Sequence, residues 1–208
     1  ASMLKVPTMV AFLRYAESNP EILSKQIYYD GSFNDNKFEY FKEKKSIVPD
    51  QYYTVEELMD YMITYSDNNA TRLLNANIDR RYLVEIYSDL GIDLPTSSTV
   101  AIDFMSAKIY SRFLRILYSS TYLSRDMSEK VLNLMTKSSA FGGLRAGVPD
   151  SIEVAHKFGE REIINPDDNS RIRELHDCGI VYPQGKNSYL ICIMTRGSNF
   201  DILQGEIS

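Results

Sequence analysis

Residues 175–195, LHDCGIVYPQGKNSYLICIMT, contain two apolar runs on either side of a short polar segment. Both runs are rich in β-branched and aromatic residues, and residues 183–187, PQGKN, have the composition of a turn. The stretch therefore predicts a β-hairpin with strands at 175–182 and 189–195. Cys178 and Cys192 can face each other across this hairpin, and we expect two half-buried free thiols and not a disulfide.

The sequence before this hairpin is organised as helices followed by one more strand. Apolar residues recur at helical spacing over 3–18, 55–63, 69–75, 82–90, 104–117 and 124–136, and a strand pattern covers 152–158. Helices that precede an antiparallel sheet, instead of alternating with its strands, indicate the α+β fold class. We expect one domain over residues 1–208, all-helical over about 1–150 and a sheet over about 151–200.

Several local signals complete this prediction. Residues 20–28 read as a short helix, and the polar residues 30–53 read as an excursion on the surface. Thr54 opens a capping-box pattern, and Asp79, Asp103 and Ser124 are residue types that cap the helices that follow them.

Apolar patterns run up to both ends of the chain, which begins with Ala1 and not with Met. A helical pattern starts at once with Met3, and residues 200–207 stop within an apolar pattern. A sheet of only three strands would leave an apolar edge open. We therefore expect an N-terminal segment and a C-terminal helix that this sequence does not contain.

The composition excludes several classes of function. The 208 residues are 44% hydrophobic, and 23 basic against 28 acidic residues give a net charge of −5, which leaves no basic excess for binding a nucleic acid. Two histidines and two cysteines are too few for a His-rich or a four-cysteine metal site, so we expect no metal and no cofactor. The same scarcity argues against a Ser-His-Asp triad, so nucleophilic chemistry would need another base.

Three short motifs contain residues that can carry chemistry. Residues 2–5 (SMLK) place a hydroxyl and an amine on one face of a helix, residues 66–68 (SDN) lie between two helices, and residues 157–159 (KFG) lie on the predicted strand. Each motif alone has an ordinary structural explanation, as a helix cap with an exposed lysine, a second cap, and a strand edge. Their combination and their order along the chain are more informative than any one of them.

Together, the motifs resemble the S-x-x-K, S-D-N and K-T-G signature of the penicillin-recognising serine enzymes, which are the serine β-lactamases and the D,D-peptidases. Residues 65–70 (YSDNNA) look like the SDN turn with its helix, residues 144–149 (LRAGVP) look like the segment before the K-T-G strand, and residues 176–181 (HDCGIV) look like the next strand. The resemblance covers essentially the whole chain and implies helices packed on an antiparallel sheet.

The resemblance implies catalytic roles for three residues. Ser2 would be the acylated nucleophile, Lys5 would take its proton, and Ser66 would relay a proton to the leaving nitrogen. Asp67 would brace the turn as a structural residue.

It also implies a substrate-binding set. Asn68 would hydrogen-bond the substrate's amide side chain, and Lys157 would place positive charge beside its carboxylate. Gly159 would let a ligand approach the strand closely, and the backbone N–H groups of Ser2 and Glu160 would form the oxyanion hole.

Two departures from the family pattern put parts of this interpretation in doubt. Phe158 stands where the family usually has Thr or Ser, whose hydroxyl helps to hold the substrate carboxylate. No E-x-x-L-N pattern lies between Asn68 and Thr99, and the one glutamate there, Glu85, falls in a predicted helix. The Ω-loop glutamate that activates the deacylating water in class A β-lactamases is therefore not evident.

Three functions stay open at this point. The first is a serine hydrolase that forms an acyl-enzyme on Ser2 with a β-lactam or an acyl-D-Ala-type amide or ester, and deacylates slowly. The second is a true β-lactamase with another route of deacylation, and the third is a non-catalytic domain that binds cell-wall peptide or a partner protein. The resemblance implies an exported protein, and the sequence leaves the oligomeric state open.

Overall fold

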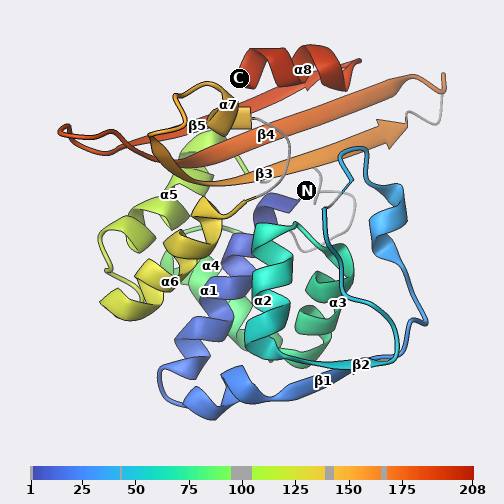
Figure 1. Ribbon diagram of the computed structural model, residues 1–208, viewed down its shortest axis with the longest axis vertical. Coiled ribbons are helices and arrows are strands. Elements are labelled where there is room, and N and C mark those ends of the chain that lie inside the picture. Colours follow the sequence, from blue (N-terminus) through green and yellow to red (C-terminus); the bar gives the residue numbers. More distant parts are fainter. Residues whose placement is uncertain (1, 43, 95–104, 139–142, 165–167) are drawn as a thin grey trace.

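The computed structural model describes residues 2–42, 44–94, 105–138, 143–164 and 168–208, and it has a layer of helices beneath a three-stranded sheet (Figure 1). The helices of the lower layer are α1 (Lys5–Ala16), α2 (Val55–Thr64), α3 (Asn68–Asn77), α4 (Arg80–Asp89), α5 (Ala107–Tyr118) and α6 (Arg125–Thr136). The sheet above them has the order β3-β4-β5 and is antiparallel, with β3 at Glu153–Ile164, β4 at Arg171–Tyr182 and β5 at Tyr189–Gly197. The predicted α+β fold class is confirmed.

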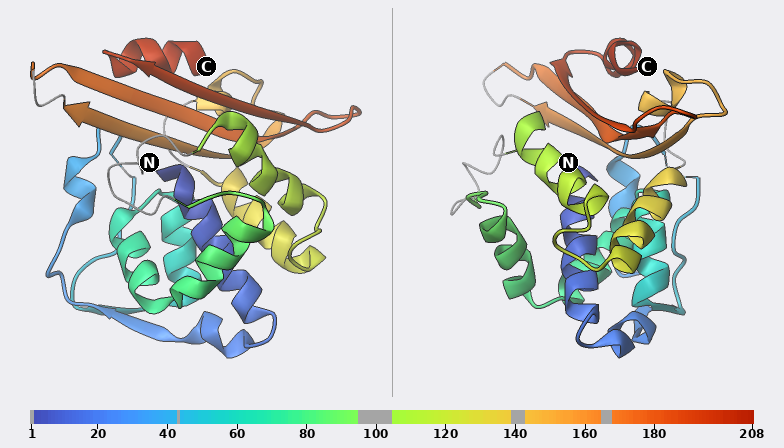
Figure 2. Two further views of the ribbon diagram at one scale, coloured as in Figure 1. Left: turned by 180° about the vertical axis from the view of Figure 1, so that it is seen from behind. Right: turned by 90° about the vertical axis from the view of Figure 1, so that its left-hand side faces the viewer.

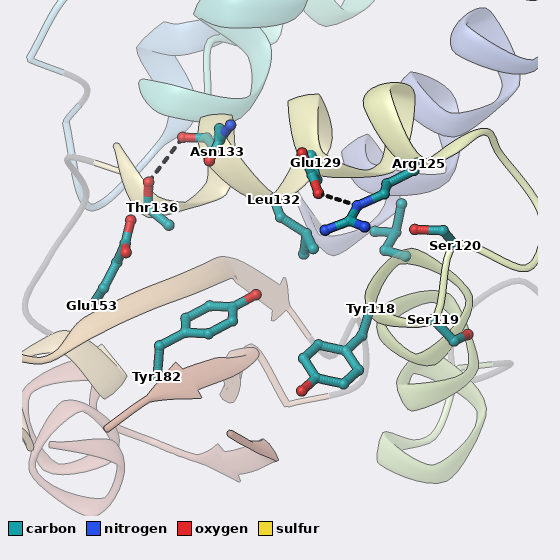
Figure 3. Close-up of a pocket in the computed structure, with 11 residues that line it drawn as sticks. Tyr118, Ser119, Ser120, Arg125, Glu129, Leu132, Asn133, Thr136, Glu153 and Tyr182 are labelled. Carbon is teal, nitrogen blue, oxygen red and sulfur yellow. Dashed lines mark hydrogen bonds and ion pairs between the residues drawn. The ribbon is translucent and has the colours of Figure 1, made fainter. Parts of the chain in front are cut away.

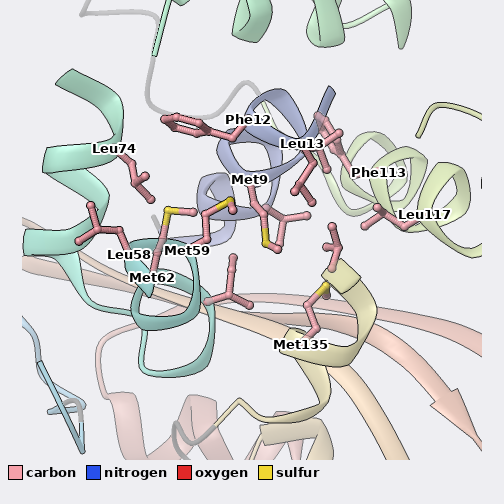
Figure 4. Packing of buried hydrophobic residues seen from close by; sticks show 14 of the residues in the cluster. Met9, Phe12, Leu13, Leu58, Met59, Met62, Leu74, Phe113, Leu117 and Met135 are labelled. Carbon is pink, nitrogen blue, oxygen red and sulfur yellow. The ribbon is translucent and has the colours of Figure 1, made fainter. Parts of the chain in front are cut away.

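Helix α1 forms the centre of the lower layer because it is apolar on almost every side. Val6, Met9, Val10 and Leu13 have no exposed surface, and the helix contacts α2, α3, α4 and α6. Figure 4 shows Met9 and Leu13 among Leu58, Met59 and Met62 of α2 and Met135 of α6. Unbranched methionines fill such irregular spaces between helices well. None of the described helices combines the length and the apolar character that a membrane span requires.

Helices α2, α4 and α6 begin where the sequence predicts. A capping box at Thr54 opens α2, and Asp79 and Ser124 accept hydrogen bonds from N–H groups in the first turns of α4 and α6. Asp103 lies outside the described residues, and the cap of α5 is Ser106, whose hydroxyl accepts from a first-turn N–H group.

The prediction for residues 20–53 is wrong in two respects. Of the predicted helix at 20–28, only Pro20–Ser24 is helical, as a 3-10 turn. Strand β1 (Gln26–Tyr29) then pairs antiparallel with β2 (Gln51–Thr54) at the base of the helical layer. These strands have four residues each, which is too short for a periodic pattern to distinguish them from a turn. Residues 30–42, called the front segment below, rise from β1 to the sheet in Figure 1 and include the 3-10 helix η3 (Asp35–Phe38).

The outer face of the sheet is covered by α8 (Phe200–Ile207), as both views in Figure 2 show. Phe200, Leu203 and Ile207 pack on a cluster that includes Phe158 and Leu175 of the sheet. The expectation that such a helix lies outside this sequence is therefore wrong. Eight residues were too few to recognise as a helix from their apolar pattern.

The hairpin of β4 and β5 is present, but the prediction of free thiols is wrong. Cys178 and Cys192 are directly opposed in the register of the two strands, and they form a disulfide. Their pairing depends on that register, which the turn sequence alone does not fix.

The short helix α7 (Gly143–Ala146) precedes β3 and contacts α8.

We predict that the disulfide stabilises the sheet. The two cysteines are 14 positions apart, so the cross-link restricts the unfolded chain and contributes about 3 kcal/mol. Urea denaturation measures the free energy of unfolding of the oxidised protein, of the reduced protein and of a Cys192→Ala variant. The reduced protein and the variant should have similar free energies of unfolding. Two thiols that titrate in the native protein, with no loss of stability on reduction, would contradict the prediction.

Candidate active site

The first two motifs meet through the amine of Lys5. Its Nζ atom donates to Ser66 Oγ at 3.1 Å and to Asn68 Oδ1 at 2.6 Å, and it also donates to the carbonyl oxygen of Ser66. Lys5 stands in the first turn of α1 and is 3% exposed, so helix packing directs a lysine side chain inward at this position. The predicted S-x-x-K and S-D-N motifs are therefore neighbours in space.

The turn at Ser66 is held by the carboxylate of Asp67. Ser66 has a φ of 59°, in the left-handed region that side chains other than glycine rarely adopt. Asp67 is fully buried and caps α3, with Oδ1 accepting from the N–H groups of Asn69 and Ala70 at 2.8 and 3.1 Å. Its Oδ2 accepts from the N–H of Ile47 at 2.8 Å. The prediction that Asp67 braces this turn is confirmed.

Lys157 reaches the same hydroxyl from the sheet. Its Nζ donates to Ser66 Oγ at 2.9 Å and to the carbonyl oxygen of Phe158 at 3.0 Å, and it lies 4.3 Å from the centre of the Phe158 ring. The side chain is fully buried. Burial, and then the nearby charge of Lys5, hold the pKa of Lys157 well below its usual range. The Ser66 hydroxyl therefore lies between two amines, one of which favours the neutral form.

Ser2 lies beside this group, at the start of the 3-10 helix η1 (Ser2–Leu4) under β3 (Figure 1). It lines a cleft of about 480 Å³ together with Asn68 and Glu160. Among the described residues the Ser2 hydroxyl makes no hydrogen bond, so the structure brings Ser2 to the shared cleft without a bond to Lys5. A Cβ atom at Gly159 would lie 3.1 Å from the Ser2 nitrogen. The glycine therefore lets the chain's own η1 approach the strand.

The front segment adds residues that the sequence analysis missed. The Oε1 atom of Glu39 accepts from Asn68 Nδ2 at 2.6 Å, and Asn36 Oδ1 accepts from the Asn68 N–H at 2.7 Å. The N–H of Phe41 donates to Glu160 Oε1 at 3.1 Å. Glu39 and Tyr40 also line the cleft. In the sequence, the pattern that could have indicated these contacts is the aromatic pair Tyr40 and Phe41 within an otherwise polar stretch.

Glu160 lines the cleft, and its carboxyl group is partly buried there. Burial raises the pKa of its carboxyl group, and its Oε2 atom is buried without a hydrogen-bond partner among the described residues. At the outer rim of the cleft, Glu162 forms ion pairs with Arg171 at 3.0 Å and with Arg173 at 2.8 Å. The lining thus contains three acidic residues, Glu39, Glu160 and Glu162, of which Glu162 is paired with arginines.

His156 is a structural residue next to Lys157. Its Nδ1 atom lies 2.9 Å from Asp177 Oδ2, which also accepts from the N–H of Leu144 at 2.9 Å. Both partners are buried, and neither lines the cleft. This pair ties β3 to β4 and to α7. In the part of the chain that the structure describes, no three His, Cys, Asp or Glu side chains group as metal ligands would.

A second cavity, of about 490 Å³, lies between α5, α6 and the sheet (Figure 3). The rings of Tyr118 and Tyr182 lie on opposite sides of it, and Arg125 pairs with Glu129 along its helical wall. It contains none of the residues that the three motifs predict.

The arrangement around Ser66 agrees with a comparison against known families. A family model described as the β-lactamase enzyme family matches residues 1–207. The chain belongs to this β-lactamase family. No curated protein sequence matches it significantly.

Several solved structures align with the whole of this β-lactamase-family chain. PBP-A has a TM-score of 0.75 at 20% identity, over 100% of this chain and 76% of that protein. A β-lactamase from Chitinophaga pinensis DSM 2588 has a TM-score of 0.78 at 20% identity, over 100% of this chain and 81% of that one. A single-residue mutant of PBP-A, solved as an acyl-enzyme complex with penicillin G, has a TM-score of 0.73 at 21% identity, with coverages of 100% and 76%. The fold is that of the β-lactamase-type serine hydrolases.

We predict that Gly159→Ala destabilises this β-lactamase-family protein. The new methyl group would lie 2.8 Å from Met3 Cγ and 3.0 Å from the Met3 nitrogen, so η1 or β3 must shift. We expect a loss of about 1 to 3 kcal/mol in thermal or urea denaturation. Gly205→Ala is the matched control, because a Cβ there has open space and lies in a helix. Equal stability of the two variants would show that the contact at Gly159 is not close.

The lowered pKa of Lys157 predicts a pH dependence of stability. Between the pKa in the folded state and the ordinary value of 10.5, the unfolded chain binds more protons, so the free energy of unfolding rises with pH. Compared with a Lys157→Met variant, the wild type should therefore gain stability as the pH rises toward 10.5, by up to about 1.4 kcal/mol per pH unit. Urea denaturation across this range measures the difference. A difference that does not change with pH would contradict a lowered pKa.

Proposed function

We propose that this chain is a serine hydrolase that forms a covalent acyl-enzyme on Ser2 with a small amide or ester substrate, either a β-lactam or an acyl-D-Ala-type peptide. The observation that carries the proposal is the Ser66 hydroxyl, held between Lys5 and Lys157 at 3.1 and 2.9 Å beside a cleft that Ser2 lines. Two buried amines and a relaying hydroxyl can move protons without a histidine.

Acylation in this proposal begins with Ser2 Oγ attacking the substrate carbonyl carbon. Before the attack, Lys5 passes its proton through the Ser66 hydroxyl to the neutral amine of Lys157. The freed amine of Lys5 then takes the Ser2 proton as a tetrahedral oxyanion forms. The bond to the leaving nitrogen or oxygen then breaks. The leaving atom takes a proton from Ser66, which regains one from a lysine, so that every proton is accounted for.

The oxyanion would be stabilised by the backbone N–H groups of Ser2 and Glu160. Strand β3 is at one edge of the described sheet, so its free side is available to the cleft. Gly159 supports this placement because it allows β3 to come within contact distance of η1. Each N–H donor of such a site contributes about 10²- to 10³-fold to the rate.

Deacylation is proposed to be slow. Glu85 lies on the exposed side of α4 and does not line the cleft. Glu39 does line the cleft, but one of its oxygens is held by the Asn68 amide. The acyl-enzyme with penicillin G described for the PBP-A mutant makes a penicillin a suitable first probe.

A non-catalytic domain that binds cell-wall peptide is the second candidate. It is favoured by the Ser2 hydroxyl, which makes no hydrogen bond among the described residues, and by the Asn68 amide, whose donor and acceptor are both engaged within the chain.

We also propose that the protein is exported. The support is the disulfide between Cys178 and Cys192, because disulfides form and persist in oxidising compartments.

We predict that Ser2→Ala abolishes covalent labelling by a fluorescent penicillin or an activated ester. Lys5→Ala should slow labelling about 10³-fold, because the nucleophile then lacks its base. Intact-mass spectrometry measures the adduct, and Ser18→Ala, at an exposed serine, serves as the control. No adduct on Ser2 in the folded protein would leave only the binding-domain candidate. With nitrocefin, a single burst supports slow deacylation, whereas sustained turnover identifies a true β-lactamase.

A further inference from the structure

The Asn68 side chain joins the front segment to the amine of Lys5. Its Oδ1 atom accepts from Lys5 Nζ at 2.6 Å, and its Nδ2 atom donates to Glu39 Oε1 at 2.6 Å. An ammonium group only donates hydrogen bonds and a carboxylate only accepts them, so the two partners together determine the orientation of the amide. With Glu39 in place, the amide oxygen of Asn68 faces Lys5.

Contacts on both sides of Glu39 hold it in this position. Three positions before it, Asn36 donates to the Asp67 carboxylate at 3.0 Å. Two positions after it, the N–H of Phe41 donates to Glu160 Oε1 at 3.1 Å. The front segment is therefore attached to the S-D-N turn and to β3, and Glu39 lies between the two attachments.

The same contacts place a negative charge close to the two lysines. Two short hydrogen bonds and one amide group separate Glu39 Oε1 from Lys5 Nζ, which is a distance of at most about 8 Å. A charge at that distance acts strongly on an amine in a partly buried site, because little water screens it. Burial and then the charge of Lys5 lower the pKa of Lys157, and three carboxylates act against this lowering, those of Asp177, Glu39 and Glu160.

The other carboxylates around the two amines are less directly connected to them. Asp177 is opposite Phe158 in the strand register and therefore lies on the outer face of the sheet. Burial raises the pKa of the Glu160 carboxyl group, which weakens its negative charge. Asp67 is directed toward the first turn of α3, whose N–H groups it caps. Among the described residues, Glu39 is the carboxylate that a hydrogen-bonded side chain links to an amine of the pair.

We infer that Glu39 is a positioning residue of the two-lysine site: it holds the Asn68 oxygen toward Lys5, and its charge sets the pH range in which one of the two amines is neutral. The inference rests on the proposed function for its kinetic meaning, because acylation of Ser2 requires the neutral amine. It also gives a role to the front segment, which contains none of the three motifs.

Glu39→Gln tests the charge, because it removes the charge and keeps an oxygen for the Asn68 amide. The protonated amines lose a stabilising partner, so the pair should release its first proton at a pH about one unit lower than in the wild type. The NMR signal of Lys157 Cε in protein labelled with ¹³C-lysine, identified by its absence in Lys157→Met, follows this titration without a substrate. The rate constant for acylation of Ser2 by a penicillin should begin to fall at a correspondingly lower pH.

Glu39→Ala tests the orientation of the amide, because it removes the acceptor as well as the charge. The titration should move in the same direction as in Glu39→Gln. The Asn68 amide is no longer fixed, so the plateau rate constant for acylation should be about tenfold below that of Glu39→Gln. Glu206→Gln, at an exposed position on α8, is the control and should leave the midpoint and the plateau at their wild-type values.

The outcomes separate this inference from the function on which it rests. An unchanged Lys157 midpoint in Glu39→Gln overturns the role of the charge, and equal plateau rate constants for Glu39→Gln and Glu39→Ala overturn the role in positioning. In both cases an adduct on Ser2 leaves the hydrolase intact. Absence of an adduct in the folded wild type overturns the proposed function, and an unchanged NMR midpoint then overturns the inference as well.

Discussion

Two buried lysine amines share one serine hydroxyl, and the rest of the site depends on this contact. Bringing two ammonium groups within about 3 Å of one oxygen, away from water, is strongly unfavourable unless one amine gives up its charge. The lowered pKa of Lys157 is the result of this constraint, because burial and the charge of Lys5 both act against its protonated form. The neutral amine that nucleophilic chemistry requires therefore follows from packing.

That contact is maintained by Asp67 of the second motif and by Asn36, which lies outside the three motifs. Asp67 fixes the left-handed turn at Ser66 by accepting hydrogen bonds from α3 and from the N–H of Ile47. Asn36 of the front segment donates to the same carboxylate at 3.0 Å and accepts from the Asn68 N–H. A polar segment that looks like a surface loop is thus part of the internal hydrogen bonding of the site. Its position in turn places Glu39 and Tyr40 in the lining of the cleft.

The sequence was sufficient for features that depend on local chemistry. Helix starts such as Thr54 and Asp79, the β4–β5 turn and the three ordered motifs could all be predicted, because each is encoded within a few neighbouring residues. Features that depend on contacts between distant segments could not be predicted. The Cys178–Cys192 disulfide depends on the register of β4 and β5, and β1 is a strand only because it pairs with β2. The hydrogen bond of Glu39 depends on the position of the Asn68 side chain. Residue type alone carries none of this information.

The two-residue period of β3 explains how the cleft can differ from the family pattern while the fold is kept. Lys157 and Gly159 face the helical layer, where they contact Ser66 and η1, whereas Phe158 faces α8. A phenylalanine at 158 therefore leaves the lysine and the close approach of η1 undisturbed, and it adds apolar contact on the outer face. The residue type at position 158 can thus change without disturbing the contact of Lys157 with Ser66, because the two side chains lie on opposite faces of one strand.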